Sequence, residues 1–134
     1  MQEQGILSTL WTLGDVCRAH ADKTAESLGL TRAEFAGMLS LEEERPITCR
    51  DMSGRMGLSV SRGSRVIERL YAKGLINRDG DTQDRRCKQI RLSPRGREIR
   101  RRLLAELRSC ENRIEAAISG KRINALKVDL IGLI

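Results

Sequence analysis

The sequence predicts a mainly α-helical fold with a small β component, of the α+β type, and three observations support this class. Apolar residues recur at three- and four-residue steps near both ends of the chain, as in amphipathic helices. Two short helical segments separated by "MGLS" lie in the middle of the chain. Two short alternating segments around a polar loop follow directly, as in a β-hairpin. The length of 134 residues suits one compact domain.

The first third of the chain is predicted to form two helices. A helix from about residue 5 to 27 is indicated by an apolar stripe of Ile6, Leu10, Leu13 and Cys17. Gly29 then ends this pattern, and Thr31 is placed to cap the next helix. That second helix is predicted over residues 31–43, and Pro46 favours an extended break after it.

Two short helices in the middle of the chain each lie between a capping residue and a glycine. Thr48 caps the first, which ends at Gly57. Ser59 caps the second, which ends at Gly74. Two short helices joined by a tight turn form the helix-turn-helix pattern.

The second of these helices has two different faces. One face carries Val60, Val66, Ile67 and Leu70, with Gly63 between them. The opposite face is polar and basic, so it can lie in the DNA major groove, where arginine donates two hydrogen bonds to guanine. The alternative is an ordinary solvated face, because exposed charge is common on helices. We predict DNA contacts from Ser61, Arg62, Ser64, Arg65 and Arg69.

A β-hairpin is predicted directly after this helix, which makes the whole segment a winged helix-turn-helix. Its strands are residues 75–78 and 88–92, and the loop between them is the wing. We predict that Arg86 enters the minor groove, where narrow DNA concentrates negative potential, and that Asp84 orients its guanidinium group. Arg85 is predicted to bind a phosphate, and Lys88 belongs to the same set of wing residues.

Two alternative interpretations of the loop stay open, and the charge distribution favours the wing. Asp84 and Arg86 could form a surface ion pair, worth ~0–1 kcal/mol. "DGDTQD" has the carboxylates of a calcium loop but lacks the central glycine and distal glutamate of that motif. Residues 50–102 hold 16 basic and 6 acidic side chains, a net +10, against −4 for residues 1–49 and +1 for residues 103–134. A basic block of this kind is typical of a segment that faces nucleic acid.

The end of the chain is predicted to form two further helices. One begins at Ser93 and Pro94, and Gly120 separates it from a last apolar helix. Helices at both ends with more apolar surface than a small domain can cover indicate an oligomer interface, and the alternative is a self-contained bundle core. We predict residues 1–30 and 94–134 as dimerisation helices and residues 31–93 as the winged DNA-binding domain. The stripe of the long helix is Ile99, Leu103, Leu107, Cys110, Ile114 and Ile118.

Several segments together resemble the MarR family of bacterial transcriptional regulators: "LGLTRAEF", "RPITCRDMSGRMGLSVSRGSRVIERLYAKGLINR" and "DTQDRRCKQIRLSPRG". The resemblance spans nearly the whole chain, and its most specific part is Asp84 and Arg86 in the wing. It implies a homodimer that binds a pseudo-palindromic DNA operator, usually as a repressor, with the terminal helices joining the two subunits.

Two features depart from the family pattern. Gly63 stands where an apolar residue is usual, which either permits close packing or loosens the helix, and only three residues are aromatic.

The signal that releases such a regulator is predicted less directly. A small-molecule effector is the first hypothesis, and a thiol-based redox switch is the alternative. Cys87 lies between two basic residues and Cys49 in a first helical turn, and both settings favour a thiolate. Cys17 and Cys110 lie on apolar stripes, where a cysteine is usually an inert core residue, so a sensing role for them is the weaker expectation.

Other functional classes are less consistent with the sequence. An enzyme is not expected, because the single histidine, His20, has no evident catalytic partner and no phosphate-binding loop occurs. Cys17 and His20 alone fall short of a zinc site, so neither metal nor cofactor is expected. No apolar run approaches the ~18 residues of a membrane span, which favours a cytoplasmic protein. A winged helix that binds protein instead of DNA is the remaining alternative.

Overall fold

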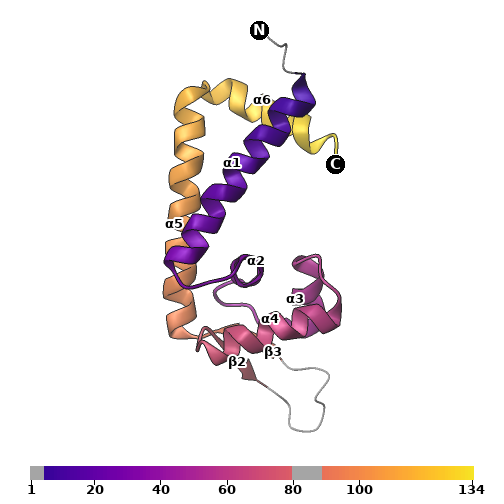
Figure 1. The fold of residues 1–134 in the computed structure, drawn as a ribbon, viewed down its shortest axis with the longest axis vertical. Helices are drawn as coiled ribbons and strands as arrows, with labels where there is room; N and C mark the ends of the chain where they lie inside the picture. The colour runs from indigo at the N-terminus through magenta and orange to yellow at the C-terminus, as the bar shows by residue number, and fades with distance from the viewer. Residues whose placement is uncertain (1–4, 80–88) are drawn as a thin grey trace. The chain divides into compact units, whose positions relative to one another are not determined.

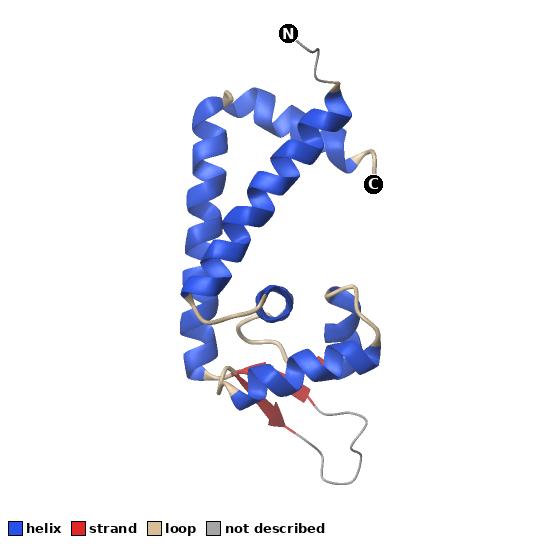
Figure 2. Ribbon diagram, in the orientation of Figure 1, coloured by secondary structure: helices blue, strands red, loops and turns tan. Residues whose placement is uncertain are grey.

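The computed structural model describes residues 5–79 and 89–134. Within these residues the chain forms six α-helices and a small antiparallel sheet of three strands (Figure 1, Figure 2). It divides into two compact units, Met1–Leu103 and Leu104–Ile134. The predicted fold class, a mainly helical protein with a winged helix-turn-helix, is confirmed.

Helices α1 (Ile6–Ser27) and α2 (Arg32–Ser40) open the first unit. Thr31 caps α2 as predicted, and it forms a complete capping box: Thr31 Oγ1 accepts from the Glu34 N–H, and the Glu34 carboxylate accepts from the Thr31 N–H. The prediction that this helix extends to residue 43 is wrong. Leu41 leaves the helix in an extended conformation and is 1% exposed, so its burial in the core ends α2 early.

Helices α3 (Cys49–Arg55) and α4 (Val60–Ala72) form the predicted helix-turn-helix. The side chains of Thr48 and Ser59 accept hydrogen bonds from backbone N–H groups in the first turns of α3 and α4, as predicted. Gly57 and Gly74 follow the two helices with φ of 68° and 73°, a left-handed conformation that glycine adopts without strain. Short-range signals in the sequence therefore placed both helices correctly.

The sheet joins β1 (Ile47–Thr48), β2 (Ile76–Asp79) and β3 (Gln89–Leu92) in the order β1-β3-β2. Both pairings are antiparallel, and their registers place Ile47 opposite Ile90 and Ile76 opposite Leu92. These four side chains are buried. The predicted hairpin is confirmed, whereas the segment before α3, predicted only as an extended break, forms a third strand.

Ser93 ties the sheet to the next helix, α5 (Pro94–Ala117). Its Oγ donates to the Gly74 carbonyl at 2.6 Å and accepts from the Gly96 N–H at 2.9 Å. A Cβ atom at Gly96 would lie 1.9 Å from the Leu75 carbonyl oxygen, so only glycine fits where α5 passes the backbone of Leu75. These contacts fix where α5 leaves the winged segment.

The core of the first unit is aliphatic and rich in methionine, as the scarcity of aromatic residues predicts. Each of its central side chains has almost no contact with water. They are Met38, Leu41, Met52, Leu70, Ile76, Ile90 and Leu103.

The second unit consists of the end of α5 and α6 (Gly120–Ile131). Gly120 is the first residue of α6, so the break between the helices lies one residue earlier than predicted, at Ser119. Residues at and after the end of α5 border an open hollow of about 380 Å³, lined by Ala117, Ile118, Arg122, Ala125, Leu126 and Asp129. Among the described helices, none is long and apolar enough to cross a membrane.

Candidate nucleic-acid interface

The rear face of α4 is fixed to the rest of the winged segment by burial. Val66, Ile67 and Leu70 are buried there, as the helical spacing predicts. The same prediction is wrong for Val60, which is 51% exposed. Val60 is the first residue of α4, and it extends beyond the part of the helix that the core covers.

Gly63 allows α4 to approach α3 very closely. A Cβ atom at this position would lie 1.8 Å from Ser53 Oγ and 2.5 Å from Ser53 Cβ. Ser53 is itself buried and donates a hydrogen bond to the Cys49 carbonyl at 2.7 Å. Of the two roles predicted for Gly63, the structure therefore supports close packing between the two helices.

The front of α4 carries three of the predicted DNA-binding residues at the surface. Ser61, Arg62 and Arg65 are exposed, and in the described part of the chain neither arginine makes an ion pair. Burying an arginine in an ion pair would remove it from a ligand, so these two side chains are available to an anionic partner. They are the strongest candidates for contact with DNA.

The other two predicted residues of α4 make contacts inside the protein. Ser64 is half-buried, donates to the Val60 carbonyl at 2.7 Å and lies 3.4 Å from the Cys49 sulfur. The Arg69 Nε lies 3.8 Å from a Glu34 oxygen, at the outer limit of an ion pair. The helical spacing in the sequence places Ser64 and Arg69 near the basic face. It does not reveal the residues inside the protein with which their side chains interact.

Glu34 anchors the carboxyl end of α4 to α2. Its carboxylate is buried and accepts a hydrogen bond from Lys73 Nζ at 2.5 Å. The same ammonium group donates to the Gly29 carbonyl at 2.7 Å. A buried carboxylate needs such a partner, so this cluster fixes the distance between α2 and α4.

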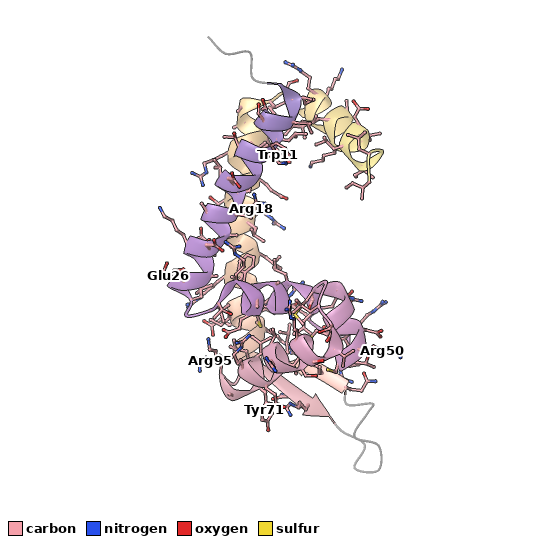
Figure 3. The ribbon with its side chains drawn as sticks, turned by 45° about the vertical axis from the view of Figure 1, so that its right-hand side comes forward. Trp11, Arg18, Glu26, Arg50, Tyr71 and Arg95 are labelled. Atoms are coloured by element: carbon pink, nitrogen blue, oxygen red, sulfur yellow. The ribbon has the colours of Figure 1, made fainter. Side chains whose placement is uncertain are left out.

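A second contact fixes the base of the hairpin to α4, and the sequence did not predict it. The Arg78 guanidinium group on β2 lies 4.2 Å above the centre of the Tyr71 ring. One of its nitrogen atoms is 2.6 Å from a Glu68 carboxylate oxygen. Figure 3 shows Tyr71 at the surface of this part of α4. The turn at Gly74 separates Arg78 on β2 from Glu68 and Tyr71 on α4, and no short-range motif connects them.

The predicted wing residues lie outside the described residues, and their roles stay predictions. This applies to Asp84, Arg85, Arg86 and Lys88, and also to Cys87. The strands on either side are described, and their last pair is Asp79 with Gln89.

Arg50 is a further candidate that the sequence argument omitted. It lies in the first turn of α3, is exposed, and makes no ion pair with any residue that the structure describes. Figure 3 shows it at the surface of the helix-turn-helix. Arginines in such positions commonly contact phosphates. The signal that could have identified it is its place two residues after the cap Thr48, in the first turn of the helix that precedes α4.

The basic start of α5 is partly neutralised within the first unit. Arg101 donates a hydrogen bond to Glu43 at 2.7 Å, and Arg102 pairs with Glu98 at 3.1 Å. The bond from Arg101, supported by the charges of Arg101, Arg100 and Arg97, lowers the pKa of Glu43, although desolvation acts in the opposite direction. Part of the positive charge counted in the sequence therefore serves internal contacts.

The three cysteines within the described residues are free thiols. Cys49 and Cys110 are half-buried, and Cys17 is exposed on α1. The expectation that Cys17 lies in a core is therefore wrong for the single chain. No group of three described His, Cys, Asp or Glu residues could hold a metal ion.

Comparison with known proteins agrees with this geometry. Residues 30–88 match the MarR family model, a segment that begins before α2 and includes the helix-turn-helix. The transcriptional repressor MprA of Escherichia coli is 27% identical over 100 residues, which cover 73% of this chain and 57% of MprA. The chain thus spans little more than half the length of this curated relative.

Solved structures share the fold over almost the whole chain. A variant of Staphylococcus aureus MepR bound to an oligodeoxyribonucleotide is 20% identical and has a TM-score of 0.69, covering 98% of this chain and 96% of that one. A MarR family protein of Mycobacterium tuberculosis in complex with salicylic acid is 21% identical, with a TM-score of 0.69 and 98% of both chains covered. The family model thus identifies residues 30–88 as a MarR family segment, the curated repressor is similar over most of the chain, and the solved structures share its fold.

Proposed function

We propose that this protein is a sequence-specific DNA-binding transcriptional regulator that acts as a homodimer, most simply as a repressor. The observation that carries the proposal is the construction of α4. Its rear face is buried and fixed through Gly63 and Glu34, while Arg62 and Arg65 at its front make no ion pair with a described residue. A helix held in place in this way, with these two arginines exposed at its front, suits the major groove. The proposal places the protein in the cytoplasm, where bacterial DNA lies.

The two parts of the chain would have separate roles. Residues 31–93 would bind DNA, and residues 1–30 and 94–134 would join two subunits. Large apolar side chains exposed on α1 and α6 support this division, because a stable single chain rarely leaves so many of them in water. A two-fold dimer would present two copies of α4 to half-sites about one helical turn apart, ~34–36 Å.

The binding proposal is tested by selecting duplexes from a random library and measuring affinity by fluorescence anisotropy at fixed salt. Arg62→Ala and Arg65→Ala are each expected to weaken binding to the selected duplex by about 1–3 kcal/mol. Arg108→Ala is the matched control, because Arg108 is also exposed and makes no ion pair with a described residue. It is expected to retain the affinity of the wild-type protein.

A different result would support a protein-binding winged helix instead. In that case no sequence would be enriched, and the three arginine variants would have equal, weak, salt-sensitive affinity for any duplex. Arg86→Ala tests the wing separately, with a loss of the same size expected if Arg86 enters the minor groove.

We infer that a small molecule releases the protein from DNA. The salicylic acid complex of the Mycobacterium tuberculosis relative supports this class of effector. Salicylate added to the preformed protein–DNA complex is the first probe, and a dose-dependent fall in anisotropy is the expected result. Unchanged anisotropy at saturating salicylate would exclude this compound as the effector.

A redox signal is the second candidate, and the contact between Cys49 and Ser64 favours it. This contact of 3.4 Å joins the start of α3 to α4, so oxidation of the sulfur would disturb the helix that we propose reads DNA. Mild peroxide should then reduce DNA affinity reversibly, and Cys49→Ser should abolish the response. A response that persists in Cys49→Ser but disappears in Cys87→Ser would assign it to the wing.

A further inference from the structure

Val60 is an exposed apolar side chain in a part of the molecule that otherwise buries such residues. Among the described residues between 28 and 103, the large apolar side chains that are exposed belong to Val60 and Tyr71. The Tyr71 ring carries the guanidinium group of Arg78 on its face. No comparable contact of Val60 with another described residue is found, and at 51% exposure it extends into solvent from the first residue of α4.

The backbone that carries Val60 is held firmly. Ser59 Oγ accepts a hydrogen bond from the Arg62 N–H at 3.3 Å, and Ser64 Oγ donates to the Val60 carbonyl at 2.7 Å. Gly63 N–H donates to the Ser59 carbonyl at 2.8 Å. Valine itself has few accessible rotamers in a helix, so its two methyl groups occupy a defined position. A side chain fixed in this way can discriminate between ligands without first losing conformational freedom.

Val60 occupies a position in the helix-turn-helix from which its methyl groups could contact DNA bases. In a helix-turn-helix, the N-terminal residues of the second helix contact base edges in the major groove. The immediate neighbours of Val60, Ser61 and Arg62, are exposed and polar. A single valine in such surroundings is too small for an apolar protein-docking patch.

We propose that Val60 determines specificity by contacting the 5-methyl group of a thymine in each half-site. Valine can neither donate nor accept a hydrogen bond, and the thymine methyl is the apolar group that base edges present in the major groove. This inference rests on the proposed DNA-binding function. It adds an apolar contact to the hydrogen bonds expected from Arg62 and Arg65.

The experiment removes the methyl groups from the DNA and from the protein separately. In the selected duplex, each thymine is replaced in turn by deoxyuridine, which differs only in the missing methyl group. For the wild-type protein, one replacement per half-site should weaken binding about fourfold, since a buried methyl or methylene group contributes ~0.8 kcal/mol. For Val60→Ala, the same replacement should have almost no effect, because the contacting methyl groups are already absent.

Two further variants serve as controls for this coupling. Glu44→Ala shortens an exposed side chain outside the proposed DNA and subunit contacts and should retain the full sensitivity to deoxyuridine. Val60→Thr keeps the shape of valine with one methyl group replaced by hydroxyl, and should lose part of the sensitivity. Both positions are exposed, and circular dichroism should show that each variant folds.

The possible outcomes separate this inference from the function on which it rests. A selected duplex that binds equally well with every deoxyuridine substitution would overturn the role of Val60 alone. Equal deoxyuridine sensitivity in the wild-type protein and in Val60→Ala would do the same. A library from which no duplex is enriched would overturn the proposed function, and the role of Val60 with it.

Discussion

Two regions of this protein have the same helical spacing of apolar residues and opposite burial. In the winged core, defined as the described residues between 28 and 103, Val66 and Leu70 of α4 are 2% and 0% exposed. In the terminal helices, defined as α1 and residues 104–134, Ile6 and Leu13 of the α1 stripe are 76% and 47% exposed. Apolar residues recur at helical spacing in both regions, although α4 separates its apolar and polar faces more sharply than α1 does, so the spacing alone does not determine burial.

The difference shows what an apolar stripe can and cannot predict. The stripe identifies which side of a helix avoids water, but the partner that covers it is a property of the whole assembly. In the winged core, that partner belongs to the same chain. For the terminal helices, we propose that it is a second copy of the chain, so the two regions should respond differently to the same substitution.

The largest effect is expected from Leu70→Ala in the winged core. Leu70 is fully buried, and truncation of a buried leucine costs about 2–5 kcal/mol of the free energy of unfolding. Leu133→Ala, at a position that is 81% exposed, should change the same quantity by less than about 0.5 kcal/mol. Urea denaturation followed by circular dichroism measures both variants. Equal losses would contradict the contrast between the two regions.

A smaller effect is expected where α3 and α4 cross. Gly63→Ala would place a methyl group against Ser53, and such overpacking costs about 1–3 kcal/mol of unfolding free energy. Gly54→Ala is the matched control, because Gly54 is also helical but has no atom within 4 Å of the added group. It should stabilise the protein by about 0.4–1 kcal/mol, since alanine has less conformational freedom in the unfolded chain.

The cause of the Gly63 effect can be tested with a second substitution. If the clash with Ser53 is responsible, Ser53→Gly should restore much of the lost stability when combined with Gly63→Ala. Additive losses in the double variant would instead indicate that the added methyl group disturbs another neighbour.

Substitutions in the terminal helices should weaken the association of two subunits more than the folding of each subunit. Leu13→Ala removes apolar surface from the exposed stripe of α1 and is expected to weaken dimerisation about tenfold, ~1.4 kcal/mol. Sedimentation equilibrium measures the dissociation constant, and circular dichroism monitors the helical content of the variant. A wild-type chain that remains monomeric at high concentration would contradict the dimer proposal outright.

The sequence predicted the features that depend on nearby residues. The caps at Thr31, Thr48 and Ser59 and the turns at Gly57 and Gly74 are local signals, and the structure confirms each of them. The strand β1 was missed because its two residues pair with β3, and the paired residues Ile47 and Ile90 are 43 positions apart in the chain. Such a pairing leaves no periodic pattern in a two-residue segment.

The same distinction explains which site residues the sequence placed correctly. Arg62 and Arg65 follow from the spacing of α4 alone. Arg69 approaches Glu34 on α2, a contact between distant positions that no helical wheel contains. Val60 shares the angular range of buried residues, but it lies at the end of the helix, where the core no longer covers it. Position along the helix, as well as around it, decides burial.

The smallest effect is expected at the surface contact between Arg101 of α5 and Glu43, the residue that was predicted to end α2. The hydrogen bond from Arg101 lowers the pKa of Glu43 in the folded state below its unfolded value of ~4.3. The contact therefore stabilises the protein fully above that value, and the contribution is lost as pH falls through the folded pKa. Glu43→Gln cannot titrate at position 43, so its urea midpoint should fall less between pH 6 and pH 3 than that of the wild-type protein.

Glu44→Gln is the control. It lies at an exposed position with no ion pair in the described structure and should follow the wild-type curve. Parallel curves for all three proteins would show that this surface contact does not stabilise the winged core, leaving its stability to the buried apolar side chains.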